Sequence, residues 1–195
     1  MPIPKLDLSS ERFLNPLQLI WADHERQFII DRELRELAHL GDIDRFTELG
    51  ELLFVFFTED LLLHHKDEEI DLFRMLRFAC RPKDRIGQVL EELDRDHAAE
   101  SYLMRIIVTD LERALGGKKL QSPAFFFTNL HHFAKGQERH ITWENEVVLP
   151  LASERLFPED IEELGRNMAA RRGVEYPISS AVISEKPRTL EKPLD

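Results

Sequence analysis

The sequence predicts an all-α protein: an up-down-up-down antiparallel four-helix bundle with a short fifth helix and an extended C-terminal tail. Apolar residues recur at spacings of three and four along nearly the whole chain, and no run alternates as a strand would. The long helical segments are joined by short links, which makes sequential helices antiparallel neighbours. With 195 residues, 43% of them hydrophobic, the chain has enough apolar material for one domain with a buried core.

The first two helices are delimited by caps and helix breakers. The first follows Asn15-Pro16, an N-cap before proline at the first helical position, and closes at Gly41. The second is expected over about residues 42–79, because Pro82 lies just beyond it, with a bend near Gly50.

The later helices are bounded in the same way. The third is expected over about residues 84–114, before Gly116-Gly117. The fourth begins after Ser122-Pro123, and Pro150 is expected to end or bend it. The inner stripe of the third helix is expected to hold Leu90, Leu93, His97, Ser101, Met104, Val108 and Leu111.

The C-terminal part divides into a short helix and a tail. A fifth helix is expected from Pro158 to Arg172. Residues 1–172 then form the metal-binding bundle, and residues 173–195, which are rich in proline and show little periodicity, form an extended or mobile tail.

Composition excludes several classes of function. A net charge of −11 opposes binding to nucleic acid, and no apolar window is long enough to predict a membrane span. The single cysteine, Cys80, rules out an intramolecular disulfide and a thiolate metal cluster. Together with the absence of a secretion signal pattern, this predicts a cytoplasmic protein.

One pattern of histidines and glutamates occurs twice along the chain. A single histidine precedes a His-x-x-x-Glu segment in each half: His24 with His64 and Glu68, then His97 with His140 and Glu144. His and Glu four apart share one helix face. Each residue falls on the apolar stripe of its helix, and the depths along the helices roughly agree. A buried glutamate needs a partner, so six metal ligands in one core are predicted.

This ligand set predicts two metal ions in one core. Four imidazoles and two carboxylates without a cysteine favour iron, with manganese or zinc as second choices. Two histidines per metal and two shared carboxylates leave coordination positions for a small ligand, as expected for binding or catalysis.

The remaining histidines are predicted to lie outside the site. His65 and Glu69 repeat the spacing but are rotated off the core stripe, so exposure is expected for both. His39 is expected to act as a surface cap at a helix end. His131 and His132 are expected to be structural, although His132 could line an access path.

The segments HHKDEEIDLF at 64–73 and HITWENEVVLPLA at 140–152 resemble the paired motifs of the hemerythrin-like, or HHE cation-binding, family. DHERQF and DHAAES resemble its two single-histidine helices, and the resemblance covers about residues 12–172. It implies a non-haem di-iron centre in a four-helix bundle, with four terminal histidine ligands and with Glu68 and Glu144 as bridging carboxylates.

Two departures from the family direct the functional hypothesis. Oxygen-carrying members have a fifth histidine where this chain has Ser101, and the four-His, two-Glu set resembles bacterial relatives linked to nitric-oxide stress and iron-centre repair. Those repair proteins carry an N-terminal cysteine-bearing segment that is not found here.

The leading hypothesis is a cytoplasmic di-iron protein that binds or reduces O2, NO or peroxide, with a separate redox partner. The alternatives are a non-enzymatic iron-handling or redox- or gas-sensing module acting through a partner protein, and a structural zinc protein. The pattern does not predict the oligomeric state or the electron donor.

Overall fold

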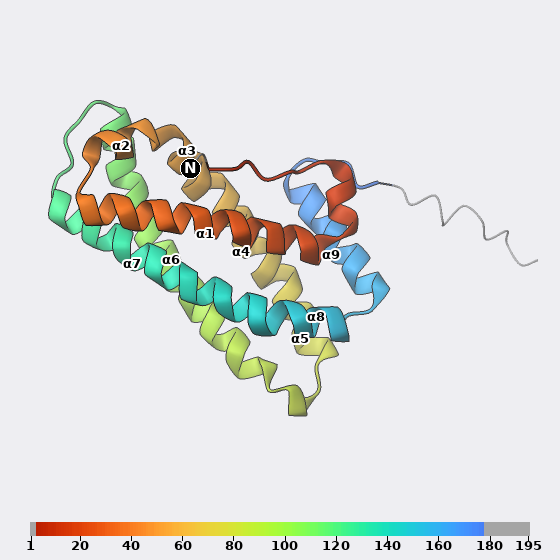
Figure 1. The fold of residues 1–195 in the computed structure, drawn as a ribbon. Helices are drawn as coiled ribbons and strands as arrows, with labels where there is room; N and C mark the ends of the chain where they lie inside the picture. Colours follow the sequence, from red (N-terminus) through yellow and green to blue (C-terminus); the bar gives the residue numbers. More distant parts are fainter. Residues whose placement is uncertain (1–2, 178–195) are drawn as a thin grey trace, which may run out of the picture.

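The computed structural model describes residues 3–177, and within them the chain is all-helical, as predicted (Figure 1). Its α-helices are α1 (Pro16–Leu40), α2 (Ile43–Glu48), α3 (Gly50–Val55), α4 (Leu61–Lys66), α5 (Phe73–Ala79), α6 (Ile86–Leu115), α7 (Pro123–Trp143), α8 (Leu149–Arg155) and α9 (Pro158–Arg171). Short 3₁₀ turns are η1 (Ser10–Leu14) and η4 (Pro82–Asp84), and π-helical stretches are η2 (Phe56–Asp60), η3 (Asp67–Leu72) and η5 (Glu144–Val148).

The first helix has the predicted bounds. Proline occupies its first position in α1, and Gly41 closes it with φ of 63°, the left-handed conformation that glycine adopts without strain. The amides of Gly41 and Asp42 both donate to the Leu37 carbonyl, which satisfies the end of the helix.

The predicted second helix is divided rather than continuous. Chain 43–48 forms the separate helix α2, and Leu49 separates it from α3, close to the bend expected at Gly50. From α3 to α5 the helix then continues through η2 and η3, where the hydrogen bonds widen to the π pattern. Such stretches insert an extra residue into the turn, so side-chain directions beyond them depart from the ordinary helical period.

The fourth predicted helix continues past Pro150, where the sequence indicated an end or a bend. It passes from α7 through η5 into α8 and ends at Arg155. Proline lacks the amide that a regular helix would use at this point, and the π-helical stretch directly before it accommodates the interruption.

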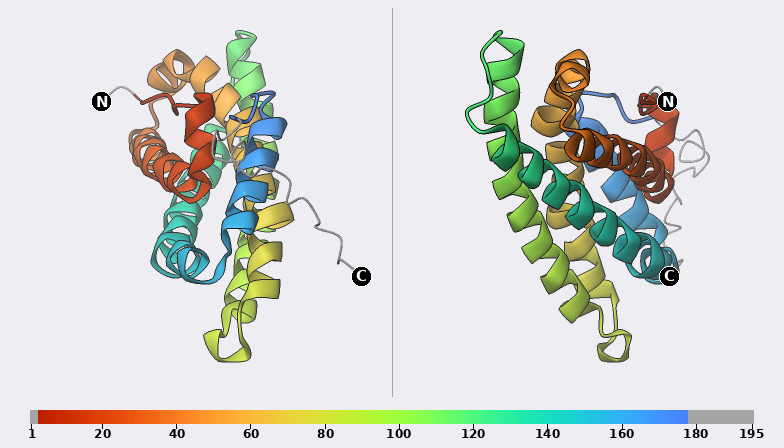
Figure 2. Two further views of the ribbon diagram at one scale, coloured as in Figure 1. Left: turned by 90° about the vertical axis from the view of Figure 1, so that its right-hand side faces the viewer. Right: turned by 60° about the vertical axis from the view of Figure 1, so that its left-hand side comes forward.

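The helices pack as a bundle with two separate apolar clusters. Helix α1 lies along α7, and α7 lies along α6, in all views (Figure 2). One cluster includes Leu34, Phe57 and Phe133, and the other includes Ile20, Leu72 and Val148. In each long helix the predicted metal ligands fall between these two clusters, so a polar layer divides the core.

The fifth helix, α9, has the predicted range to within one residue and packs beside η1 and η3. A Cβ added at Gly165 would lie 2.1 Å from the Phe13 carbonyl oxygen, so only glycine permits this close approach of α9 to η1. Of the predicted tail, residues 178–195 lie outside the described residues.

None of the helices over residues 3–177 is long and apolar enough to cross a membrane.

Candidate metal centre

The structure brings all six predicted ligands into one buried cluster. Every long helix of the bundle contributes, and none of the six residues is more than 1% exposed. The predicted ligands are His24 on α1, His64 on α4, Glu68 on η3, His97 on α6, His140 on α7 and Glu144 on η5.

The cluster divides into two sets of ligand atoms that share both glutamates. His24 and His64 form one set with Glu68 and Glu144, and His97 and His140 form the other with the same two carboxylates. Within each set the ligand atoms lie within 4.8 Å of one another. Two adjacent metal ions bridged by two carboxylates fit this arrangement.

The inner ring nitrogens point at the carboxylates. The distance from Nε2 of His64 to Oε1 of Glu68 is 3.1 Å, and that from Nε2 of His97 to Oε2 of the same glutamate is 3.3 Å. Glu144 spans both sets in the same way, with oxygens 3.3 Å from His24 and 3.1 Å from His140.

Several inner atoms lack a hydrogen-bond partner among the described residues. They are both carboxylate oxygens of Glu68 and Glu144 and the Nε2 atoms of His97 and His140. Leaving one such buried polar atom unpaired costs about 1–3 kcal/mol, and more for a charged group. Metal ions would satisfy these atoms together, so the donors present fit the predicted group.

Both glutamates of the cluster lie on π-helical stretches. Glu144 is the first residue of η5, and Glu68 is the second residue of η3. The wider turn departs from the regular i→i−4 hydrogen-bond ladder at the residue that is shared by the two sets of ligand atoms. The π-helical turn was not predicted, because it has no signal in the apolar spacing.

The outer ring nitrogens of three histidines have hydrogen-bond acceptors. Nδ1 of His64 donates to Asp23 (3.1 Å), and Nδ1 of His97 donates to Glu69 (2.9 Å). His24 donates to the amide oxygen of Asn145 (2.6 Å). These bonds fix the tautomer that turns each Nε2 lone pair toward the centre. The fourth outer nitrogen, on His140, lies 3.9 Å from Asp96, beyond hydrogen-bonding distance.

These supporting residues were missed in the sequence, although they repeat along it. An aspartate directly precedes each single histidine, and it approaches the paired histidine of its own half: Asp23 faces His64, and Asp96 faces His140. The residue after each bridging glutamate instead supports the single histidine of the other half. The repeated Asp-His dipeptide was the available signal.

The prediction that His65 is exposed was wrong. His65 is 5% exposed, its ring stacks on His97 with centroids 4.0 Å apart, and its Nε2 lies 3.4 Å from an oxygen of Glu100. The segment lies between η2 and η3, so the rotation assumed from a regular helix does not apply. Glu69 is exposed, as predicted, with 45% of its side chain accessible, and it also accepts a hydrogen bond from His97.

The inner stripe of α6 also differs from the prediction. Glu100 and Ile107 are buried where Ser101 and Val108 were expected, and Ser101 is only half-buried. Positions three and four residues after His97 can both lie on the same helix face. The apolar pattern favoured Ser101 over Glu100, because a glutamate is not expected to be buried.

The other histidines lie away from the ligands. His39 is exposed in the last turn of α1, as predicted for a cap. His131 and His132 are exposed on α7.

Carboxylates and imidazoles shift one another's pKa values. Burial lowers the pKa of His97, but the neighbouring carboxylates of Glu68 and Glu69 outweigh it and raise the pKa to about 10. Burial alone would raise the pKa of Glu68, yet the charge of His64 and the nearby imidazoles of His24 and His97 hold it well below its usual range. Glu68 is thus the charged partner of His64 and His97 in the metal-free cluster, and a metal that binds there would displace protons from these imidazoles.

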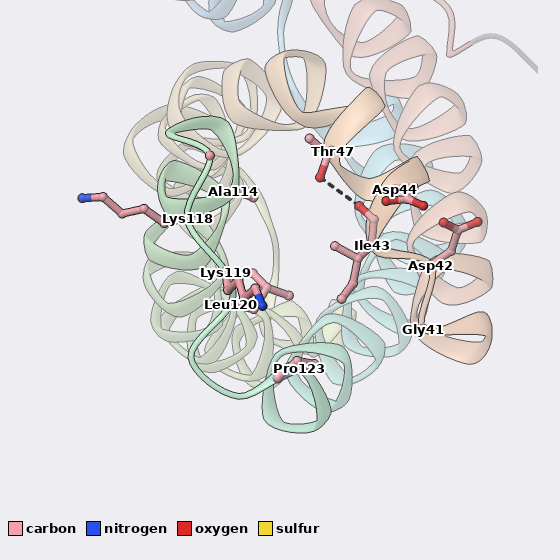
Figure 3. Close-up of a pocket in the computed structure, with 11 residues that line it drawn as sticks. Gly41, Asp42, Ile43, Asp44, Thr47, Ala114, Lys118, Lys119, Leu120 and Pro123 are labelled. Atoms are coloured by element: carbon pink, nitrogen blue, oxygen red, sulfur yellow. Dashed lines mark hydrogen bonds between the residues drawn. The ribbon is translucent and has the colours of Figure 1, made fainter.

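A surface cavity of about 740 Å³ lies at the far end of the bundle (Figure 3). It is bordered by Gly41, Ile43 and Thr47 on one side and by Lys119 and Pro123 on the other. None of the six candidate ligands lines it. The candidate centre is therefore an internal site, distinct from this cavity.

Comparisons with known proteins agree with the geometry. The family model described as Hemerythrin HHE cation binding domain matches residues 15–152. A protein of Haemophilus influenzae described as uncharacterized is 24% identical over 163 residues, which is 82% of this chain and 91% of that protein. No solved structure matches. Because the family model covers most of the chain and all six clustered residues, the chain belongs to the hemerythrin HHE cation-binding domain family.

Proposed function

We propose that this chain is a non-haem di-iron protein that binds or reduces a small ligand, O2, NO or peroxide, at its four-histidine, two-glutamate centre. The observation that carries the proposal is the pair of ligand sets that share Glu68 and Glu144. Bridging carboxylates place two metals side by side, and two adjacent redox-active ions can supply two electrons to one bound ligand.

The donor set favours iron over zinc. Each ion would receive two imidazoles and one oxygen from each bridging glutamate, without a thiolate. Four donors would close a tetrahedral zinc site, whereas iron accepts more ligands and would keep open positions for a small molecule.

The surrounding residues have defined roles in this proposal. Asp23 and Glu69 orient His64 and His97 by accepting from Nδ1, and they increase the basicity of the inner nitrogens. The apolar clusters on both sides of the polar layer exclude bulk water and admit uncharged small molecules.

We further propose a cytoplasmic location, a separate redox partner and an up-down-up-down order of the four long helical segments. The single cysteine suits a reducing compartment. The two contacts of α7, with α1 and with α6, suit this helix order.

Metal analysis of anaerobically purified protein, followed by absorption spectra on adding O2, NO or hydrogen peroxide, tests the proposal. We expect two irons per chain and a ligand-dependent change in the iron absorption bands. Replacing His64 or His140 by alanine should lower the iron content below two. His132→Ala, a change at an exposed histidine on α7, should leave it unchanged.

Three results would contradict the proposal. One is a protein isolated with zinc and without iron-dependent spectra. Another is a His64→Ala variant that keeps two irons and the wild-type spectrum. A protein with two irons whose spectrum responds to none of the three ligands would instead favour an iron-handling role.

A further inference from the structure

The two ligand sets would each hold one metal ion together with the shared glutamates. We call them the first metal position, with His24 and His64, and the second metal position, with His97 and His140. Metal affinity depends on the ligands and also on the hydrogen bonds that orient them, and losing one such bond typically costs about 10–100-fold. The outer ring nitrogens of the four histidines therefore show whether the two positions are equivalent.

Both histidines of the first metal position are oriented from outside. Nδ1 of His24 donates to the amide oxygen of Asn145 (2.6 Å). Nδ1 of His64 donates to Asp23 (3.1 Å), a carboxylate that is only 6% exposed. The two rings are therefore held in the tautomer and direction that a metal requires.

Within residues 3–177, only one histidine of the second metal position has an outer hydrogen bond. Nδ1 of His97 donates to Glu69 (2.9 Å). The ring of His97 also stacks on those of His65 and Phe73, with centroids 4.0 and 5.8 Å apart. Neither ring nitrogen of His140 has a hydrogen-bond partner in the described part of the chain. His140 is thus the least supported of the four histidines.

The carboxylate that could support His140 is bound to an arginine instead. Asp96 corresponds to Asp23 in the repeat, since each directly precedes the single histidine of its half. One oxygen of Asp96 accepts from Arg139, and the other lies 3.9 Å from Nδ1 of His140. Arg139 is 65% exposed and Asp96 is 24% exposed. The arginine therefore keeps this carboxylate at the surface, beyond hydrogen-bonding distance of the ligand.

The arginine nearest to Asp23 in the first half binds a different carboxylate. Arg26 donates to Asp60 (2.6 Å) and lies 3.5 Å from Oδ1 of Asp23. The other oxygen of Asp23 is 3.1 Å from His64. The repeat therefore has the same aspartate in both halves, but only the first of them reaches its histidine.

We propose that the two metal positions are inequivalent, with the first binding its ion more tightly and the second filling last and emptying first. The missing bond at His140 predicts dissociation constants that differ by about 10–100-fold. Arg139 acts as a positioning residue, because it keeps Asp96 from His140. This assignment rests on the two-metal centre of the proposed function, whatever ligand that centre takes. Metal then enters and leaves the centre at the second position.

Titration of the metal-free protein with Co²⁺ against a competing chelator tests the order of binding, with the visible absorption of bound Co²⁺ as the readout. Repulsion between two ions in equal positions would also give two binding steps, so variants with one position removed decide. His140→Ala should hold its remaining ion about 10–100-fold more tightly than His64→Ala holds its own. Equal affinities in these two variants would overturn the inequivalence.

Arg139→Ala keeps all six candidate ligands and should strengthen the weaker position. It frees Asp96 to accept from His140, so we expect the weaker Co²⁺ step to tighten about 10-fold while the tighter step stays unchanged. Lys135→Ala removes the same charge at an exposed position one turn earlier on α7 and is the control. A gain no larger than that of Lys135→Ala would overturn the role of Arg139.

A double-mutant cycle isolates the contact between Asp96 and His140. Asp96→Ala alone should change the weaker step little, because Asp96 does not reach His140 in the wild type. Added to Arg139→Ala, it should abolish the gain, and a gain that persists without Asp96 would contradict the positioning role.

The Co²⁺ measurements separate this inference from the proposed reaction. A protein that shows the expected affinities but responds to none of O2, NO and hydrogen peroxide would contradict the proposed function and support the inequivalence. Equal affinities in His64→Ala and His140→Ala would overturn the inequivalence even in an iron protein that reacts with one of these ligands.

Discussion

Contacts of the outer ring nitrogens, Nδ1, hold the histidines of the candidate centre in their orientation. The acceptor oxygens of Asp23, Glu69 and Asn145 lie 2.6–3.1 Å from Nδ1 of three histidines. Such bonds restrain the ring orientation and the tautomer before a metal arrives. We therefore expect the supporting residues to contribute to metal affinity without touching the metal.

Asp23→Asn should weaken metal binding, because the amide accepts less strongly from His64 than the carboxylate does. Loss of such a supporting partner typically costs 10–100-fold in metal affinity, and we expect a loss of about that size. Titration with a competing chelator measures it. Glu25→Gln, at an exposed position on α1, is the control, and equal affinities of the two variants would contradict the supporting role.

Asp31→Asn should stabilise the protein at neutral pH. The pKa of Asp31 is raised in the folded state by burial and by Glu100, so the folded protein binds its proton more tightly than the unfolded chain does. The resulting stability is lost as pH rises above roughly 4, the unfolded value. We expect a gain in stability at pH 7 and little difference below pH 4, measured by urea denaturation. A neutral or destabilising effect at pH 7 would contradict this.

At the residue scale, the sequence could predict site residues only where they repeat at a fixed spacing on one face of a helix. The six ligands meet that condition, and they cluster in the structure. His65, Glu69 and Glu100 do not, because their burial or bonding depends on π-helical turns and on charged partners from other helices. A period calculated for a regular helix contains neither kind of information.

At the scale of elements, arginines of helix α9 form ion pairs with η3, the π-helical stretch that carries Glu68. Arg171 donates to Asp67 (2.7 Å) and to Asp71, and Arg172 lies 2.7 Å from Asp67. Both aspartates are buried and belong to η3, the π-helical stretch that contains Glu68. This helix lies beyond the residues that match the family model.

Arg171→Ala should destabilise the fold by about 2 kcal/mol, because two buried carboxylates lose a charged donor while Arg172 and Asn167 still reach them. It should also lower metal affinity, since η3 holds Glu68. Urea denaturation and chelator competition measure the two effects, and Arg171→Lys should restore part of each. Glu162→Gln, which removes an exposed pair with Arg166 on the same helix, should change neither by more than about 0.5 kcal/mol.

The bounds of elements were predictable where proline or glycine marks them. Pro16, Gly41, Pro123 and Pro158 delimit helices as expected. Pro150 shows the limit of this rule, because a π-helical stretch lets the helix continue past it to Arg155. Hydrogen-bond spacing within a helix depends on packing, which a proline alone does not reveal.

At the scale of the whole molecule, a charged layer separates two apolar clusters. The polar layer holds four histidines and two glutamates that are almost completely buried. Their charges are balanced either by protons or by metal ions, so the stability of the whole bundle is linked to both.

The metal-free protein should lose stability as pH rises from roughly 6.5 to about 10. The pKa values of His64, His97 and His140 are raised in the folded state by neighbouring carboxylates, that of His97 to about 10. A histidine pKa that is raised in the folded state stabilises the fold, and this stabilisation is complete below the unfolded pKa of roughly 6.5. It disappears as the pH rises and the histidines of the folded protein lose their protons. Melting temperatures across this range measure it, and a flat profile would be the contrary result.

Metal removal should destabilise the protein, and the loaded form should show a flatter profile in the same pH range. A ligand at 100 times its dissociation constant stabilises the folded state by about 2.7 kcal/mol. Melting curves with and without a chelator test this. Equal melting temperatures for the loaded and stripped protein at pH 8 would indicate that metal does not bind to the folded bundle.

The single histidine of each half is supported by a residue of the other half. Glu69 from the first half bonds to His97 of the second, and Asn145 from the second half bonds to His24 of the first. One helical hairpin alone would lack the partner for its own single histidine, but two identical hairpins related by a two-fold axis would each complete the other. Orientation of the two single histidines therefore requires that both halves of the chain are folded against each other.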